Sequence, residues 1–329
     1  MTDPGRSLGP VVRLAPAKLN LTLAVVGRRP DGFHSLHSVM VPLGLADRLS
    51  LAPLPGGDDT LHVEGFDPGP PEGNLVLRAL AAARGAVTRR RLAAPPLAAR
   101  LEKRIPVAAG LAGGSSDAAA ALDGALEAWG AELEPDARFE IAAMLGSDVP
   151  FFLGGGAALV EGRGERVTPL HGVKGIRDGP VEPPGVLLVT PAMPAHTATV
   201  FAAWSGGAMG DPGVVRRTSE HFASEFGSGL TVRALVERAG VLASANDLLQ
   251  AAASVVPGLV PFRRALTRLL GRPIGLSGSG PTLWALYPSL EETEEAADAV
   301  RNAVDAGTLA VDGTPFVTAT TIALNRRSE

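Results

Sequence analysis

The chain has 329 residues, of which 34 are acidic and 30 are basic, with a formal net charge of −4 and 46% hydrophobic residues. This length allows two domains of ordinary size with substantial cores. A pI near 5.9 gives no basic footprint for nucleic acid, and we interpret Arg89-Arg90-Arg91 as a solvated face. The absence of cysteine excludes disulfides, thiolate metal sites and cysteine nucleophiles.

The N-terminal residues lack the apolar core of a signal peptide, and no apolar run reaches the length of about 18 residues that a membrane helix needs. We therefore expect a cytoplasmic protein with neither nucleic acid nor membrane as a partner. We also expect a monomer or homodimer, and the motifs described below add a small-molecule substrate. Only Lys18, Lys103 and Lys174 are lysines. Lysine is a compact point charge and arginine a broad fork, so each lysine in this arginine-rich chain draws attention.

Residues 11–26 alternate between apolar and polar, which predicts a half-buried strand with Lys18 and Asn20 on one face. Residues 27–32 form a glycine-proline turn. In the rest of this half we predict strands at 33–45, 48–52, 61–63, 97–101 and 157–161. We predict helices at 74–86 and 136–145, and between them a helix over the alanine run that ends at Trp129.

Residues 170–185 are rich in glycine and proline and mark the predicted domain boundary, with one domain at 1–175 and the other at 176–329. Beyond the boundary we predict strands at 186–190, 283–287 and 316–324, and helices near 197–204, 230–241, 245–255, 261–270 and 289–306. Strict strand-helix alternation is missing, so two α+β domains fit better than a doubly wound sheet.

The most informative segment is residues 106–123, a glycine-rich turn followed by two serines and an alanine run. Alanine favours a helix, and Ser115, Ser116 or Asp117 is expected to cap its first amides. Gly130 is expected to end it. Because a helix N-terminus attracts anions and glycines let the backbone approach, the segment predicts a phosphate-binding loop.

Two known phosphate motifs do not fit this segment. A Walker A loop needs Lys-Ser/Thr after its last glycine, and here Gly114 is followed by Ser115-Ser116. The G-x-G-x-x-G spacing of dinucleotide-binding folds is absent. A tight loop that serves helix packing alone is the alternative to a phosphate cradle of a third type, and we favour the cradle because two serines stand beside three glycines.

Three other places could contribute chemistry. Lys18 and Asn20 belong either to an exposed strand face or to a site. Asp148 follows a helix end and is either a turn residue or a base that accepts a proton from a substrate hydroxyl, with an ammonium nearby. Residues 275–282 form a second glycine-serine turn, for which a packing role is the alternative.

His34 and His37 are the one close histidine pair. On a strand, residues three apart point to opposite faces, and no cysteine or patterned acid accompanies them, so a metal site is disfavoured. Phe33 beside His34 suits recognition of a nucleobase, with a ring for stacking and a polar edge for reading it.

Taken together, these motifs resemble the GHMP kinase superfamily, in order along residues 15–21, 29–34, 106–116, 145–152, 245–248 and 275–282. The resemblance implies an α+β fold with an N-terminal domain like the second domain of ribosomal protein S5 and a ferredoxin-like C-terminal domain. The motifs are most similar to those of members that phosphorylate the 2-hydroxyl of 4-diphosphocytidyl-2-C-methyl-D-erythritol in the non-mevalonate isoprenoid pathway, with ATP and Mg²⁺.

The resemblance also implies residue roles. Lys18 and Asp148 would be the catalytic pair, and Asn74 and Lys103 would lie near the adenine. Residues that would hold the ATP phosphates are Pro106, Val107, Ala108, Ala109, Gly110, Leu111, Ala112, Gly113, Gly114, Ser115 and Ser116. Residues that would bind the substrate are Asn20 and Thr197 at the erythritol, Phe33 and His34 at the cytosine, and Gly278 and Ser279. The Mg²⁺ ligands are not implied, although Ser115 or Ser116 is a candidate.

Two departures from the family pattern matter. Phe33 stands where tyrosine is usual, which keeps the ring and removes a hydroxyl. Ala112 stands where glycine is common, so we expect a negative φ there. The alternatives are a GHMP kinase for homoserine, mevalonate or a sugar, disfavoured by Phe33 and His34, and a catalytically silent nucleotide sensor, disfavoured by Lys18 and Asp148.

Overall fold

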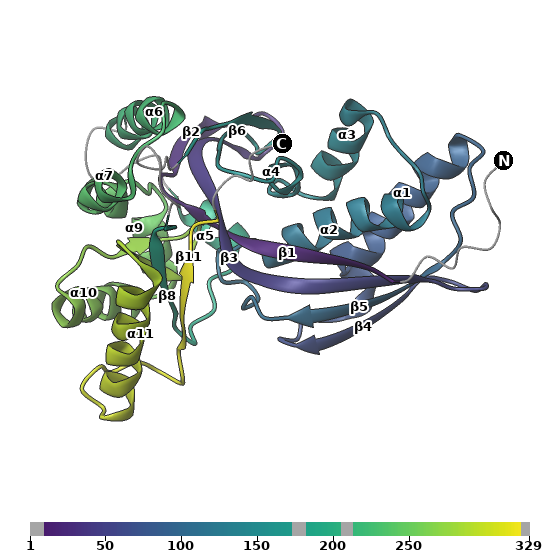
Figure 1. Ribbon diagram of the computed structural model, residues 1–329. Coiled ribbons are helices and arrows are strands. Elements are labelled where there is room, and N and C mark those ends of the chain that lie inside the picture. Colours follow the sequence, from purple (N-terminus) through teal and green to yellow (C-terminus); the bar gives the residue numbers. More distant parts are fainter. Residues whose placement is uncertain (1–9, 173–181, 205–212, 324–329) are drawn as a thin grey trace. The chain divides into compact units, whose positions relative to one another are not determined.

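A computed structural model describes residues 10–172, 182–204 and 213–323 (Figure 1). By packing, the chain forms two compact units whose residues alternate along the sequence. Unit 1 consists of the chain up to Ala17, Ala46–Val107 and Gly113–Leu153, and unit 2 of Lys18–Leu45, Ala108–Ala112 and the chain from Gly154 onward. The division at residues 175 and 176 stays a prediction, because the compact units follow other boundaries.

Unit 1 contains a sheet covered by helices. Its strands are β4 (Thr60–Gly65), which is parallel to β5 (Leu97–Lys103), and residues 48–53 of β3 (His34–Pro53), which are antiparallel to β5. Its helices are η1 (Pro71–Gly73), α1 (Leu75–Arg89), α2 (Gly113–Ala128), α3 (Pro135–Leu145) and α4 (Val149–Leu153). Figure 1 shows α1 and α2 side by side over one face of β4 and β5. The buried alanines of α2 allow this close approach.

Helix α2 begins earlier than predicted. Its first residue is Gly113, so Ser115, Ser116 and Asp117 lie inside the first turns and none of them precedes the helix as a cap. That part of the prediction is wrong. The predicted end is confirmed: Gly130 takes a φ of +59°, and the Ala131 N–H donates to the Leu126 carbonyl over 2.9 Å.

Strand β3 continues into unit 2, where the same seven-stranded sheet is antiparallel. In it, β2 (Ala24–Arg28) and β6 (Ala158–Gly162) both pair with the first half of β3, and β6 pairs with β7 (Arg166–Pro169). β1 (Val11–Asn20) also pairs with β3. Lys18 and Asn20 lie on one side of β1, as predicted, with their side chains in contact. The alternative of an exposed strand face is wrong, because both residues are buried, as is Leu19 between them.

The second sheet of unit 2 has the order β11 (Phe316–Thr321), β8 (Gly185–Thr190), β10 (Leu283–Tyr287) and β9 (Gly275–Leu276), all antiparallel. Its helices are α5 (Thr197–Ala203), α6 (Val214–Gly227), α7 (Val232–Glu237), α8 (Ala239–Ser244), α9 (Leu249–Val255), α10 (Leu259–Leu270) and α11 (Leu290–Asp305). Helix α11 packs on β8 and β11. The α+β class is confirmed, and among the described residues no helix is both long and apolar enough to cross a bilayer.

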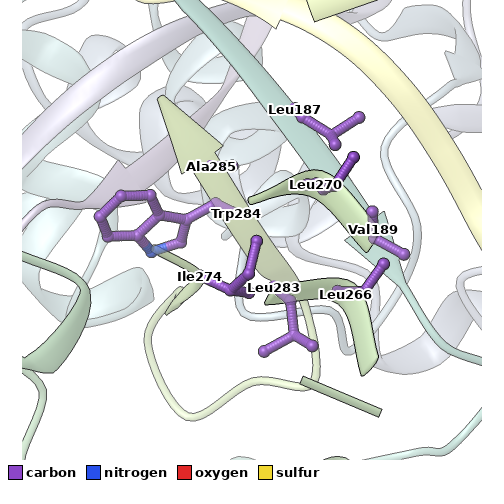
Figure 2. A pocket seen from close by; sticks show the side chains of 8 residues that line it. All are labelled: Leu187, Val189, Leu266, Leu270, Ile274, Leu283, Trp284 and Ala285. Carbon is purple, nitrogen blue, oxygen red and sulfur yellow. The ribbon is translucent and has the colours of Figure 1, made fainter. Parts of the chain in front are cut away.

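Figure 2 shows an apolar pocket in the core of this second sheet, and it has no room for a water molecule. Its lining comes from β8, β10 and α10 and consists of Leu187, Val189, Leu266, Leu270, Ile274, Leu283, Trp284 and Ala285. The indole nitrogen of Trp284 is buried, with no hydrogen-bond partner in the described chain. A lining without charged groups does not suit phosphate, so the site must be sought elsewhere.

Candidate active site

The loop before α2 has an unusual backbone. φ is positive at every second residue, with +54° at Ala108, +77° at Gly110 and +55° at Ala112. The expectation of a negative φ at Ala112 is therefore wrong. Successive N–H groups in such alternating conformations form a concave nest that binds anions. A left-handed conformation costs a residue with a Cβ about 1–2 kcal/mol, so Ala108 and Ala112 store strain in this loop.

The loop leads directly into the first turn of α2, whose leading N–H groups have no partner within the helix. Ser116 Oγ is also buried, with no hydrogen-bond partner in the described chain. Gly113 leaves little room for a side chain, since a Cβ there would lie 3.0 Å from the Ile105 side chain and 3.1 Å from the Lys103 amine. Unpaired donors and a backbone without side chains make this turn suitable for phosphate oxygens.

The second glycine-serine turn supports the loop. Ser277 Oγ donates to the Gly110 carbonyl over 3.0 Å, and the Thr282 N–H donates to the Ala109 carbonyl over 3.3 Å. A Cβ on Gly110 would lie 2.3 Å from the Ser277 carbonyl oxygen, so only glycine fits there. Residues 275–282 therefore have a packing role, and what they pack against is the loop at residues 108–112.

Lys18 lies against the same loop. Its side chain is 3% exposed, and its ammonium donates to Asn20 Oδ1 and to the Gly110 carbonyl, each over 2.6 Å. A Cβ on Gly278 would lie 3.1 Å from this ammonium. The structure therefore brings together Lys18, Asn20, Gly110 and Gly278 from three separate parts of the sequence.

Thr197 and Ser279 also meet. Thr197 is the first residue of α5 and is exposed, whereas Ser279 is buried, and their hydroxyl oxygens are 3.0 Å apart. The pair presents two neighbouring hydroxyl groups that can donate to or accept from a sugar-like ligand.

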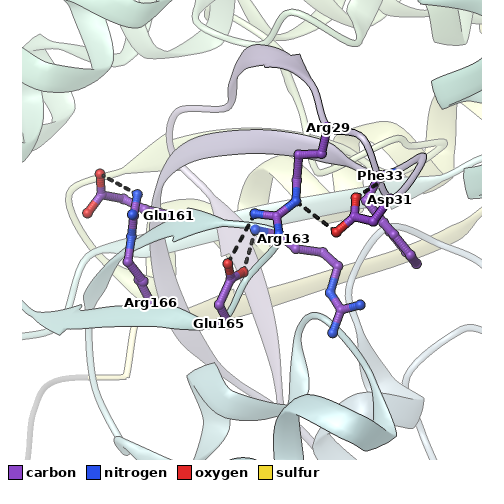
Figure 3. Close-up of polar contacts among 7 residues, drawn as sticks. All are labelled: Arg29, Asp31, Phe33, Glu161, Arg163, Glu165 and Arg166. Atoms are coloured by element: carbon purple, nitrogen blue, oxygen red, sulfur yellow. Dashed lines mark hydrogen bonds and ion pairs between the residues drawn. The ribbon is translucent and has the colours of Figure 1, made fainter.

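Phe33 lies at the surface, where 48% of the residue is exposed. Its N–H donates to Asp31 Oδ1 over 3.1 Å, and the Arg163 guanidinium covers its ring at 4.8 Å from the centroid. Figure 3 shows Arg29 joining this turn to the β6–β7 hairpin through ion pairs with Asp31 and Glu165. These contacts hold the ring in a defined position with part of its surface free for a ligand.

His34 lies among aromatic rings that the sequence analysis missed. Its ring stacks on Phe201 at 5.2 Å and meets the edge of Trp204 at 5.3 Å. Burial, and secondarily the charge of Arg28, lower the pKa of His34, so its ring is neutral at pH 7. Phe201 and Trp204 stand four and seven residues after Thr197, a spacing that places them on one helical face and could have revealed them.

Asp148 belongs to unit 1 and is half-buried directly before α4. A Cβ on Gly146, two residues earlier, would lie 3.9 Å from Ser115 Oγ. The turn that carries Asp148 thus lies beside the first turn of α2. Lys18 belongs to unit 2, so its pairing with Asp148 stays a prediction.

The two residues expected near adenine have structural contacts of their own. Asn74 caps α1, with its Oδ1 accepting from the Val76 N–H over 2.9 Å. The buried Lys103 ammonium donates to Asp47 and, over 2.7 Å, to Asp117. Their contacts with adenine stay predictions. Over the described ranges, no three histidine or acidic side chains gather as metal ligands would.

Comparison with known proteins adds to this geometry. Residues 74–156 match the GHMP kinases N terminal domain. A 4-diphosphocytidyl-2-C-methyl-D-erythritol kinase of Pelotomaculum thermopropionicum is 38% identical over 290 residues, which cover 87% of this chain and 92% of the relative. The kinase of that name from Methylorubrum extorquens strain PA1 is 40% identical over 295 residues, with coverage of 88% and 94%.

Solved structures agree. The crystal structure of a 4-(cytidine 5'-diphospho)-2C-methyl-D-erythritol kinase has a TM-score of 0.66 at 32% identity, covering 94% of this chain and 99% of that one. A homoserine kinase from Cytophaga hutchinsonii reaches a TM-score of 0.67, covering 99% and 98%, at only 15% identity. The second likeness therefore shows a common fold alone.

Proposed function

The chain belongs to the 4-diphosphocytidyl-2-C-methyl-D-erythritol kinases, a family of GHMP kinases, and on this premise we propose that it transfers the γ-phosphoryl group of ATP to the 2-hydroxyl of 4-diphosphocytidyl-2-C-methyl-D-erythritol. The observation that carries the proposal is the Lys18 ammonium, buried and in contact with the phosphate-loop carbonyl of Gly110. A reaction that consumes ATP suits the cytoplasmic location expected from the sequence.

In this proposal, residues 106–116 hold the ATP phosphates. The alternating φ values from Ala108 to Ala112 turn backbone N–H groups toward an anion, and the first turn of α2 adds more donors and the positive end of its dipole. Backbone donors are fixed before the substrate arrives, so they stabilise charge without reorganisation.

Lys18 and Asp148 take the chemical roles. The Asp148 carboxylate accepts the proton of the substrate 2-hydroxyl. The hydroxyl oxygen then bonds to the γ-phosphorus of ATP, and the bond between this phosphorus and the oxygen that leaves with ADP breaks. Lys18 stabilises the negative charge on the transferring group. Asn20 and Thr197 orient the erythritol part, and the contacts of Lys18 with Asn20 and of Thr197 with Ser279 support this placement. Positioning of this kind supplies most of the catalysis in phosphoryl transfer.

Mg²⁺ is the expected companion of ATP. Mg²⁺ keeps several waters and takes few protein ligands, and in phosphate-binding loops one of them is a serine or threonine hydroxyl. Ser116 Oγ, buried and with no hydrogen-bond partner in the described chain, fits that role. When bound, the ion would neutralise charge on the phosphate oxygens.

The cytosine is proposed to bind at Phe33, His34 and Phe201. Phe33 offers a partly free ring face, and His34 is a neutral ring that can both donate and accept a hydrogen bond. Phe201 brings a second ring to the same place. This aromatic group supports a nucleobase-bearing substrate over homoserine, mevalonate or a sugar, none of which can stack on it as a base does.

The test combines purified protein, ATP, Mg²⁺ and the cytidyl substrate, and follows the products by phosphorus NMR. We expect ADP and a new phosphomonoester, with Asp148→Asn as the control that loses this product and keeps its affinity for ATP. Phosphorylation of homoserine, mevalonate or a sugar in its place would identify a different GHMP kinase. Binding of ATP without any product would indicate a nucleotide sensor.

A further inference from the structure

The amide of Asn20 has two possible orientations of nearly the same shape. Its oxygen accepts hydrogen bonds and its nitrogen donates them. With the oxygen toward Lys18, the amide accepts from the ammonium, as observed over 2.6 Å. With the nitrogen toward Lys18, two donors would face each other in a buried place, where an unpaired donor is costly. The contact between Lys18 and Asn20 therefore depends on what orients the Asn20 amide.

The hydroxyl of Ser38 orients the amide. Ser38 Oγ donates its single proton to the Thr22 carbonyl over 2.6 Å, which leaves the oxygen as an acceptor. Asn20 Nδ2 donates to this oxygen over 2.8 Å. Ser38 is completely buried, so bulk water does not take its place. Since the hydroxyl can only accept from the amide, the amide nitrogen faces Ser38 and the amide oxygen faces Lys18.

A neighbouring group of hydroxyls and a histidine meets the side chain of Thr22 and not the Thr22 carbonyl that accepts from Ser38. Ser219 of α6 donates to the His37 carbonyl over 3.2 Å, and its Oγ lies 2.6 Å from Thr22 Oγ1 and 2.9 Å from His37 Nδ1. These contacts join α6 to β3, but none of them touches the Asn20 amide. Ser219, like Ser38, is completely buried.

We infer that Ser38 is a positioning residue for phosphoryl transfer: its hydroxyl fixes the Asn20 amide so that the amide oxygen holds the Lys18 ammonium beside the phosphate loop. The inference rests on the proposed catalytic role of Lys18. Ser38 itself does not touch the reacting atoms, so its effect must pass through Asn20. Its contribution is to the rate of the chemical step and not to ATP binding.

The first test is kinetic. Ser38→Ala removes the acceptor and frees the amide to turn, so kcat should fall about 10- to 100-fold, the size of effect that a small misplacement of a catalytic group produces. KM for ATP should change by less than about threefold, since the loop is untouched. Ser38→Cys keeps the shape with a weaker hydrogen-bonding group, and its kcat should lie between those of the wild type and Ser38→Ala.

Ser219→Ala is the matched control. It deletes another completely buried hydroxyl from the same unit and should lower thermal stability to a similar degree, with kcat near the wild-type value. A double-mutant cycle then tests whether the effect of Ser38 passes through Asn20. In an Asn20→Ala background, Ser38→Ala should lower kcat little further. If Ser219→Ala lowers kcat as much as Ser38→Ala does, or if Ser38→Ala keeps the wild-type kcat, the inference is overturned.

A measurement independent of activity separates this inference from the proposed function. The chain has only three lysines, so lysine labelling for nitrogen NMR gives few ammonium signals, and Lys18→Met assigns that of Lys18. Ser38→Ala should shift this signal and Ser219→Ala should not. If the wild type failed to phosphorylate the cytidyl substrate, the proposed function would be wrong. The shift of the Lys18 signal would still test whether Ser38 positions Lys18 through Asn20. An unshifted Lys18 signal in Ser38→Ala would refute the link.

Discussion

The ammonium of Lys18 occupies a space bounded by the Asn20 amide, the Gly110 carbonyl and the backbone of Gly278. A guanidinium is broader than an ammonium and presents its donors in a planar fork. Lys18→Arg keeps the charge but should lower kcat/KM by about 100-fold or more, in line with the cost of misplacing a catalytic group. Steady-state kinetics and a thermal melt check this together. Wild-type kinetics in the Lys18→Arg variant would show that Lys18 is only a structural charge.

At the cytosine position, Phe33→Ala should raise KM for the cytidyl substrate about tenfold or more, because stacking of a base on a ring contributes about 1–3 kcal/mol. KM for ATP should barely change, since the phosphates are assigned to residues 106–116. Phe33→Tyr keeps the ring and serves as the matched control, with near wild-type kinetics. A rise in KM for ATP alone would show that the two subsites are assigned wrongly.

Residue types in the sequence were enough to select Lys18, Asn20 and Phe33 as candidates. Their surroundings could not be predicted. The partners that bury Lys18 and Asn20 are Gly110, 92 residues from Lys18, and Ser38, 18 residues from Asn20, and no local pattern reveals such contacts. An alternating strand with polar residues normally faces water, so a buried polar face is an exception that tertiary hydrogen bonds make possible.

Among the elements, the loop at residues 106–116, for which we propose phosphate binding, carries strain that substitution can relieve. Ala112 has a φ of +55°, which glycine adopts freely and alanine does not. Ala112→Gly should raise the free energy of unfolding by up to about 1 kcal/mol, the gain from relieved strain being partly offset by the greater entropy of glycine in the unfolded chain. Chemical denaturation measures this change, and KM for ATP should stay close to that of the wild type.

Ala109→Gly is the control for that prediction. Ala109 belongs to the same loop, is buried, and is not among the residues with positive φ. Glycine at this position relieves no backbone strain and removes a buried methyl group, so the variant should be less stable than the wild type. Equal effects of the two substitutions would argue against strain at Ala112.

Beneath the start of α2, Asp47 and Asp117 share the Lys103 ammonium. Asp47 Oδ1 also accepts from the N–H groups of Arg104 and Ile105, whereas Asp117 Oδ1 is buried with no partner in the described chain. Burial, opposed by Lys103 and reinforced by Asp47, raises the pKa of Asp117 to about 7. The folded state therefore holds a proton on Asp117 at pH values where the unfolded state has released it.

A raised carboxyl pKa makes the folded state more stable at low pH. The contribution is complete below the ordinary aspartate pKa and is lost as pH rises through about 7. Asp117→Asn cannot lose a proton, so its free energy of unfolding should not fall in this way as pH rises. At pH 8 the variant should be more stable than the wild type by about 1–4 kcal/mol. Denaturation at several pH values between 5 and 8 measures the slope. Asp47→Asn should instead destabilise the folded state, because it weakens the acceptor of the Arg104 and Ile105 N–H groups. An unchanged slope in Asp117→Asn would exclude Asp117 as its source.

Most helices and strands could be predicted from local pattern. Helix α1 starts at Leu75, one residue after the predicted start at Asn74. Helix α11 matches the predicted acidic helix within one residue at each end. Helix α6 was missed although its buried Ser219, Phe222, Ala223 and Phe226 follow helical spacing. Strand β3 runs without the break predicted between residues 45 and 48, because pairing with β6 and β5 on successive stretches extends it.

At the scale of the whole molecule, compact units and sequence order do not coincide. Each unit collects three stretches of chain, and the five residues Ala108–Ala112 belong to unit 2 although their neighbours on both sides belong to unit 1. Composition marks linkers but not long-range packing. The glycine- and proline-rich composition of residues 170–185 therefore predicted a boundary, and nothing in the local sequence could show that residues 109–110 pack on residues 277–282.

This arrangement predicts that the first 175 residues do not work alone. The fragment lacks Ser277 and Thr282, which hold the loop at Gly110 and Ala109, and it lacks Ala245, whose carbonyl accepts from the Leu23 N–H over 2.7 Å. It should melt without a cooperative transition and should not bind ATP at concentrations that saturate the full chain. Circular dichroism and calorimetry measure the two properties.

Supplying residues 176–329 in trans gives the control, because it returns the missing partners without the covalent link. If the loop depends on those partners, the mixture should recover a cooperative transition and ATP binding that the first fragment lacks. A first fragment that melts sharply and binds ATP by itself would instead establish residues 1–175 as an independent domain. The packing of Gly110 against residues 277–280, where a Cβ would lie 2.3 Å from the Ser277 carbonyl, would then contribute to rigidity and not to folding.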